Sequence, residues 1–205
     1  MDIAVAARKT GIFTRRICPA SFEEHSMTVH EKFYTQFIAP VESRMMRSIW
    51  RLVRHEQLAE DTLQDVLILI WRKRERIRRH PNPEALILKM CLDCGYDSLR
   101  KQERRRRLVK ARQAKTEKFS VEKSAAHELE RKELEAEVLG AIACLSRKQA
   151  TAVLMRIVQR QEYDVIARAM ECSETTARIH VSRGRKRLSE RLAHLLKSSV
   201  EGGSL

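Results

Sequence analysis

The stretch that decides the fold is EYDVIARAMECSETTARIHVSRGRKRL, residues 162–188. Apolar residues recur every three or four positions on both sides of a short polar break, which predicts two helices joined by a tight turn. Ser173 stands in that break, where its side chain can cap the second helix. The second helix is rich in Arg and Lys. This combination is typical of a helix-turn-helix, which places its second helix in the DNA major groove.

The predicted second helix has an apolar and a polar face. Helical spacing puts these residues on the apolar stripe: Ala177, Val181, Gly184, Leu188, Leu192 and Leu195. The opposite face carries Thr175, Arg178, Ile179, Ser182, Arg183 and Lys186. Arg can bond guanine with two parallel hydrogen bonds, whereas Thr and Ser reach base edges or phosphates. A solvated basic face on an ordinary bundle helix is the simpler alternative. The helix-turn-helix spacing favours DNA, with the later basic residues, 183–187, directed at phosphates.

Composition supports a polyanionic partner. The chain has 205 residues, 41 of them Lys or Arg against 27 Asp or Glu, so its formal net charge is +14. Such a surplus favours nucleic acid or an anionic membrane surface, although a merely basic surface is the alternative. No apolar run approaches the roughly 20 residues of a membrane span. The first 26 residues lack the apolar core of a signal peptide. We therefore expect a cytoplasmic protein without membrane insertion.

The preceding sequence is also helical in pattern. One apolar stripe runs from Phe37 to Leu52, and Pro40 predicts a kink or break within it. A second helix is predicted over residues 56–79. The sequence HPNP, residues 80–83, predicts a break, after which Asn82 caps a third helix and Pro83 occupies its first position.

These patterns predict an all-α fold of two small helical domains joined by a charged linker, because no strand pattern of any length occurs. The predicted segments are a flexible extension (1–28), a first domain (29–107), a linker (108–127), a helix-turn-helix domain (128–196) and a flexible tail (197–205).

The first domain carries charged surfaces of both signs. Two basic runs, residues 72–79 and 100–112, could form a long basic track. An acidic segment, LAEDTLQDV (58–66), stands between basic stretches. Helical spacing puts Asp61, Gln64, Asp65 and Ile68 on one face, which phosphates would repel and a basic protein would attract. Solvated surface is the alternative for both the basic and the acidic segments.

No catalytic or metal-binding pattern emerges. The five cysteines are odd in number and irregularly spaced, which argues against a disulfide framework. Cys91 and Cys94 form a C-x-x-C, but a structural zinc site needs four ligands and no second pair is nearby. We interpret them as buried, unreactive thiols. Without a phosphate-binding glycine loop or a nucleophile beside a base, we expect no enzyme, metal or cofactor.

These features, in this order, resemble the extracytoplasmic-function sigma factors of bacterial RNA polymerase. The stretch YTQFIAPVESRMMRSIWRLVRHEQLAEDTLQDVLILIWRKRERI (34–77) is similar to the opening helices of sigma region 2. LILKMCLDCGYDSLRKQERRRR (86–107) resembles the continuation of that region. AIACLSRKQATAVLMRIVQRQEYDVIARAMECSETTARIHVSRGRKRL (141–188) resembles region 4.

The resemblance assigns roles to these faces. It implies that Asp61, Gln64 and Asp65 dock on core RNA polymerase. The promoter −10 element would be bound by Arg78, Arg79, His80, Asn82 and Arg100. The −35 element would be read by Thr175, Thr176, Arg178, Ile179, Ser182, Arg183 and Lys186. Implied partners are core polymerase, promoter DNA and, as is common in the family, an anti-sigma factor.

Four positions depart from the family pattern. Leu86 replaces the usual Trp, Asp93 the usual Asn, Glu171 the Gly of the turn, and His180 a frequent Arg. They suggest an unusual promoter sequence. Two other function classes stay open: a stand-alone helix-turn-helix regulator, which would need a ligand pocket or dimer helix, and a recombinase or nuclease, which would need a nucleophile or clustered carboxylates.

Overall fold

The computed structural model describes residues 24–113 and 126–195, and within these ranges every regular element is helical. The all-α prediction is confirmed for this part of the chain. The predicted extension and tail lie largely outside it, since residues 1–23 and 196–205 are not described. Residues 24–28, assigned to the extension, belong instead to helix α3 (Glu24–Phe33).

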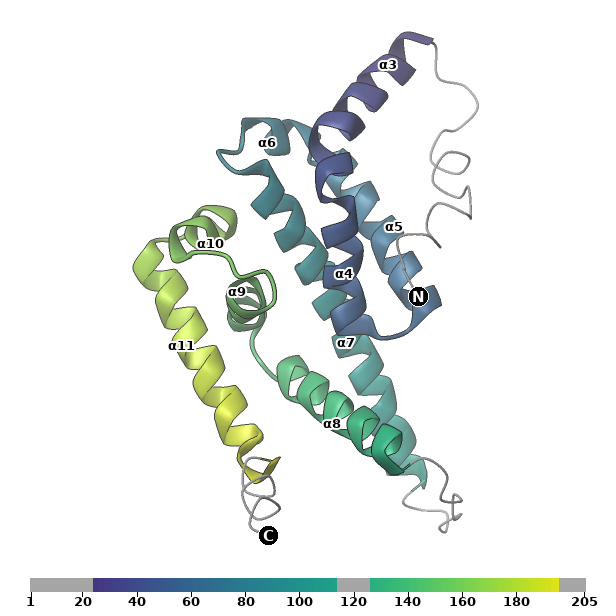
Figure 1. The fold of residues 1–205 in the computed structure, drawn as a ribbon, viewed down its shortest axis with the longest axis vertical. Coiled ribbons are helices and arrows are strands. Elements are labelled where there is room, and N and C mark those ends of the chain that lie inside the picture. Colours follow the sequence, from purple (N-terminus) through teal and green to yellow (C-terminus); the bar gives the residue numbers. More distant parts are fainter. Residues whose placement is uncertain (1–23, 114–125, 196–205) are drawn as a thin grey trace.

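The first block begins with a bent helical segment. After α3 the chain forms a π-helical turn, η1 (Tyr34–Ile38), and a 3-10 turn, η2 (Ala39–Val41), before α4 (Glu42–Val53). Pro40 lies in η2, where its missing N–H removes one helical hydrogen bond. The predicted break at Pro40 is therefore confirmed. Figure 1 shows α3 projecting at the top of the first block, with α4 continuing from it.

The predicted helix over residues 56–79 is divided in two. Helix α5 (Glu56–Arg72) ends at Lys73, whose N–H donates to Leu69 O and Ile70 O at 3.0 and 3.1 Å. A short helix, α6 (Arg74–Arg79), then turns away. Ile77 of α6 is fully buried. The sequence did not predict this division, because a lone buried apolar residue gives no periodic signal.

Helix α7 (Pro83–Gln113) is the long central helix of the molecule. It begins as predicted, with the Ala85 N–H donating to Asn82 Oδ1 at 3.0 Å. It continues six residues into the predicted linker, which was placed from residue 108 onward. Residues 114–125, the remainder of that linker up to α8, lie outside the described part of the chain.

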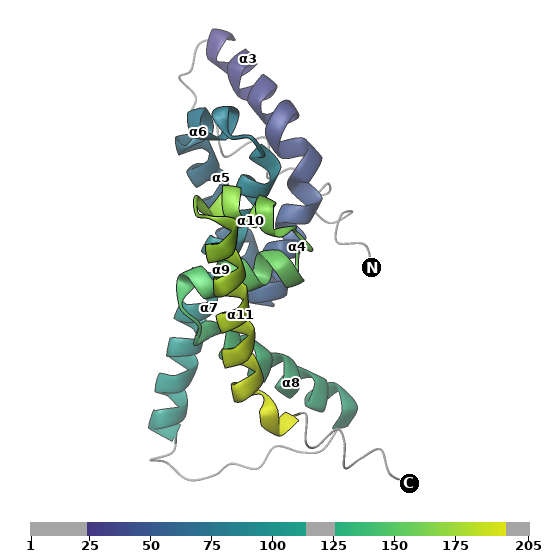
Figure 2. The ribbon, with the colours of Figure 1, turned by 90° about the vertical axis from the view of Figure 1, so that its left-hand side faces the viewer.

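The second block consists of four helices, α8 (Ala126–Ala143), α9 (Arg147–Ile157), α10 (Tyr163–Met170) and α11 (Glu174–Arg191). Figure 2 views the molecule from the side of α11 and shows α10 and α11 in front of the other helices. The helix predicted to carry the basic face thus lies on the outside of the molecule.

The two blocks share an apolar core along α7, which contacts α4 and α5 of the first block and α8, α9 and α10 of the second. Buried residues of both blocks belong to one continuous cluster, from Phe33 of α3 to Val181 of α11. Tyr96 of α7 is fully buried beside Leu145, and its hydroxyl donates to the Leu145 carbonyl at 2.6 Å. The sequence alone had predicted two domains held by a linker, without this contact.

The C-x-x-C pair lies in α7. Cys91 is fully buried in the core and Cys94 is half-buried, both as free thiols. Burial raises the pKa of each thiol, so the thiolate needed for reaction is disfavoured. In the described residues no three His, Cys, Asp or Glu side chains gather as a metal site would require. None of the described helices combines the length and apolarity needed to cross a membrane.

Candidate nucleic-acid interface

The turn between α10 and α11 has the geometry of a helix-turn-helix. Glu171 ends α10 in the left-handed conformation, with φ 52° and ψ 50°. The N–H of the next residue, Cys172, donates a hydrogen bond to the Ala167 carbonyl at 3.0 Å. Ser173 is extended, and its hydroxyl accepts the Thr176 N–H at 3.1 Å. The cap predicted at Ser173 is confirmed, and the turn reverses the chain within three residues.

The back of α11 packs on α9. Ala177, Val181 and Gly184 are buried, as the apolar stripe predicted, while Leu188 and Leu192 are half-buried nearer the end of the helix. A Cβ atom at Gly184 would stand 2.5 Å from Val153 Cγ2. The absence of a side chain at Gly184 therefore lets α11 approach α9 closely.

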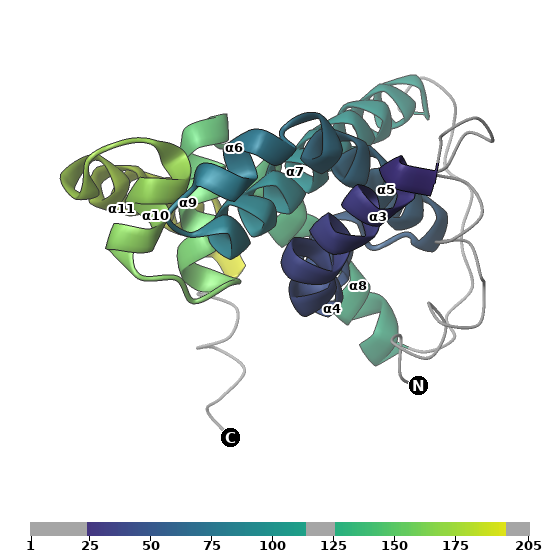
Figure 3. The same cartoon turned by 90° about the horizontal axis from the view of Figure 1, so that it is seen from above.

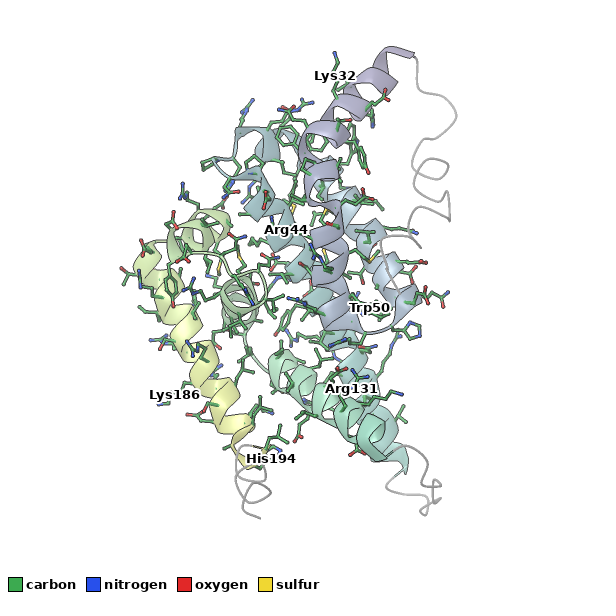
Figure 4. All side chains as sticks on the ribbon, viewed as in Figure 1. Lys32, Arg44, Trp50, Arg131, Lys186 and His194 are labelled. Atoms are coloured by element: carbon green, nitrogen blue, oxygen red, sulfur yellow. The ribbon has the colours of Figure 1, made fainter. Side chains whose placement is uncertain are left out.

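The opposite face of α11 is open. Six of the residues predicted to read DNA are exposed on it: Thr175, Arg178, Ile179, Ser182, Arg183 and Lys186. Ile179 is 41% exposed although it is apolar. Thr176 differs, because it is half-buried and its hydroxyl lies 2.8 Å from Ser173 Oγ. Figure 4 shows Lys186 projecting outward from α11.

His180 flanks this face. Partial burial lowers the pKa of its imidazole, and the positive charges of Lys148 and Arg183 lower it further. The ring is therefore neutral at pH 7 and can donate one hydrogen bond and accept another.

Residues 135–188, which hold the second half of α8, all of α9 and α10 and most of α11, match the family described as Sigma-70, region 4. The chain carries a sigma-70 region 4 domain. This match agrees with the resemblance of residues 141–188 to sigma region 4 found in the sequence. No protein of curated function matches the chain significantly.

A solved structure with a similar chain is the sigma factor RpoE in complex with the anti-sigma factor NepR from Bartonella quintana. The two chains are 23% identical. The similarity covers 79% of this chain and 98% of the other, with a TM-score of 0.48.

A second surface of the protein is acidic. Asp61, Gln64 and Asp65 are exposed on one face of α5, and Ile68 beside them is 51% exposed. The spacing argument thus placed these four residues correctly on a common face. Neither carboxylate forms a salt bridge with any residue in the described ranges. On the other side of the helix Thr62 is buried, and its hydroxyl lies 3.0 Å from Ser98 Oγ of α7.

The residues assigned to the −10 element lie in two places. Arg78 and Arg79 are exposed on α6, and His80 and Asn82 follow in the short connection to α7. Asn82 uses its carbonyl oxygen as the α7 cap. Arg100 is separate, because 18 residues of helix place it about 27 Å from Asn82 along α7. It is exposed and lies over the Tyr96 ring at 5.9 Å.

The connection before α7 also meets the helix-turn-helix. His80 Nε2 lies 3.2 Å from the Arg168 carbonyl of α10, and Arg76 of α6 forms an ion pair with Glu171 in the turn. Figure 3 shows α6 next to α10 when the molecule is seen from above. The surfaces assigned to the two promoter elements are therefore neighbours in this arrangement.

Sequence analysis missed the polar contacts between the blocks. Thr151 of α9 donates to Asp93 Oδ1 at 2.7 Å, and Arg147 pairs with Asp97 at 3.0 Å. Gln159 donates to the Leu88 carbonyl at 3.1 Å. The one available signal was Asp93 itself, an acid where a neutral amide was expected.

Proposed function

We propose that this protein is an RNA polymerase sigma factor of the extracytoplasmic-function type. It binds core RNA polymerase through its first block and directs the enzyme to promoters whose −35 element is read by α11. The observation that carries the proposal is the capped helix-turn-helix within residues 135–188, with its polar face open to solvent. Such a subunit acts where the polymerase and DNA are, in the cytoplasm, and performs no chemistry of its own.

The acidic face on α5 is the proposed polymerase contact. Asp61 and Asp65 are exposed, close together and surrounded by a strongly basic chain, so this face would attract a basic surface that the rest of the molecule repels. The partly exposed Ile68 adds apolar area beside the two charges. A charged rim around an apolar contact is common in protein interfaces.

Promoter binding is assigned to two surfaces, one on each block of the molecule. Ser182, Arg183 and Lys186 lie along α11, where they can meet bases and phosphates of the major groove. Arg78 and Arg79 offer cations beside the start of α7 for the −10 element.

The proposal is tested by co-purification with bacterial core RNA polymerase. We expect the full-length wild type to be retained, and Asp61→Arg/Asp65→Arg to bind about tenfold more weakly or worse, because attraction becomes repulsion. Glu133→Arg/Glu190→Arg is the matched control. It makes the same change in net charge at exposed positions of the second block, and it should bind as the wild type does.

Two results would count against the proposal. Equal binding by both double variants would remove the α5 face as the polymerase contact. No retention of the wild type, together with tight and sequence-specific DNA binding by the free protein, would favour a stand-alone helix-turn-helix regulator.

A further inference from the structure

Tyr163 is the first residue of α10, and two guanidinium groups lie against its ring. The ring is half-buried, and Arg178 Cζ of α11 lies 4.3 Å from its centroid. Arg156 Cζ, from α9, lies 4.9 Å from the same centroid. Three helices of the region 4 domain therefore meet at this aromatic side chain, which sequence analysis did not single out.

Arg178 is held a second time by its own helix. Its Nε and Nη2 atoms donate to Glu174 Oε1 at 3.1 and 2.5 Å, one turn earlier in α11. Stacking on a ring restricts the plane of a guanidinium, and a carboxylate along one edge restricts its rotation within that plane. Together they fix an exposed side chain that would otherwise sample many rotamers.

The contacts with Tyr163 and Glu174 leave the far end of the Arg178 guanidinium available. Arg has five N–H donors in one plane, and the contacts with Glu174 engage the Nε side of that plane. The two Nη atoms form the fork that bonds guanine O6 and N7. A stacked guanidinium keeps this fork pointing outward, because the aromatic face attracts the plane of the group and occupies none of its N–H groups.

We propose that Tyr163 is a positioning residue for base recognition, acting by presenting Arg178 to one base pair of the upstream promoter element. This inference rests on the proposed sigma function and adds a determinant of sequence preference outside the recognition helix. The physical reason is preorganisation: ordering a long side chain before binding removes that entropic cost from the complex with DNA. The wrong base gains nothing from the fixed geometry, so discrimination increases.

The test uses the full-length protein with core polymerase and a barcoded pool of linear DNA templates randomised over both promoter elements. Transcripts are sequenced for the wild type, Arg178→Ala, Tyr163→Leu and Tyr163→Phe. We expect Arg178→Ala to abolish the preference at one upstream base pair. Tyr163→Leu should reduce that same preference by about two- to fivefold, while Tyr163→Phe, which keeps the ring, should retain it.

Two further variants separate positioning from loss of structure. Arg178→Lys keeps the charge but not the planar fork, so it should lose the preference at the same base pair without unfolding. The double variant Arg178→Ala/Tyr163→Leu should show no loss beyond Arg178→Ala, because Tyr163 acts only through Arg178. Circular dichroism melting of each variant reports whether the fold is kept.

Other outcomes overturn the inference. If Tyr163→Leu retains the preference that Arg178→Ala loses, or weakens transcription equally at all templates, Tyr163 is only a packing residue. An unchanged preference in Arg178→Ala would remove Arg178 as the reader. Failure of the proposed function looks different, since the wild type itself would then give no transcription or no upstream preference.

Discussion

Glu171 bears a backbone strain that its side chain partly offsets. A non-glycine residue in the left-handed region costs about 1 kcal/mol or more, and Glu171 adopts it to end α10. Its carboxylate is paired with Arg76 of α6, an ion pair in which both side chains are well exposed. Exposed pairs contribute roughly 0–1 kcal/mol, so the strain is the larger effect.

We therefore expect Glu171→Gly to raise the free energy of unfolding by about 0.5–1 kcal/mol, measured by urea denaturation. Glu171→Ala is the control, because it loses the ion pair without relieving the backbone, and it should be slightly less stable than the wild type. A glycine variant less stable than the wild type would show that the Arg76 pair outweighs the strain.

At the scale of elements, α8 and α11 each contain a glycine in very different surroundings. A Cβ at Gly184 of α11 would clash with Val153 and lie 3.4 Å from the Gln149 carbonyl. A Cβ at Gly140 of α8 would meet only the end of the Glu103 side chain, at 3.7 Å or more. Alanine is the better helix former at both positions by about 1 kcal/mol, so packing decides whether a Gly→Ala substitution stabilises or destabilises the protein.

We expect Gly140→Ala to raise the free energy of unfolding by about 0.5–1 kcal/mol and Gly184→Ala to lower it by about 1–3 kcal/mol. Thermal and urea denaturation would measure both. Adding Val153→Ala to Gly184→Ala should recover part of the loss by making room for the new methyl group. Stabilisation by Gly184→Ala alone would mean that α9 and α11 are not packed this closely in solution.

For the whole molecule, the contact between blocks is both apolar and polar. Thr151 is 2% exposed and donates to Asp93, which also pairs with Lys89 at 2.7 Å. The neighbouring pair of Asp97 and Arg147 is much more exposed, at 43% and 54% of the two side chains. Loss of one partner costs more stability for a hydrogen bond buried between the blocks than for an ion pair at the exposed rim, because the remaining buried group has no water to bond.

Asp93→Ala should lower the free energy of unfolding by about 1–3 kcal/mol, because it leaves the buried Thr151 hydroxyl without its acceptor. Asp97→Ala, at the rim of the same interface, should cost less than about 1 kcal/mol. Chemical denaturation of the full-length protein measures both variants. Equal costs, or no cost for Asp93→Ala, would argue that the blocks do not pack along α7 in this way.

Local signals in the sequence were sufficient for the helix-turn-helix. Ser173 caps α11 because a hydroxyl before a helix satisfies a free N–H, and Asn82 caps α7 for the same reason. Periodicity also placed Ala177 and Val181 inside and Asp61 and Asp65 outside. These features depend on residues within a few positions of one another, which a linear pattern records directly.

The sequence by itself thus determined an all-helical chain, its caps and the faces of α5 and α11. Only the tertiary structure decided the division at Lys73, the shared core along α7 and the meeting of Asp93 with Thr151 and of Tyr163 with Arg178. Each of these depends on contacts between residues distant in sequence or on a single buried side chain such as Ile77. Periodicity carries no information about such contacts, because it reports which face of a helix is buried and not against what.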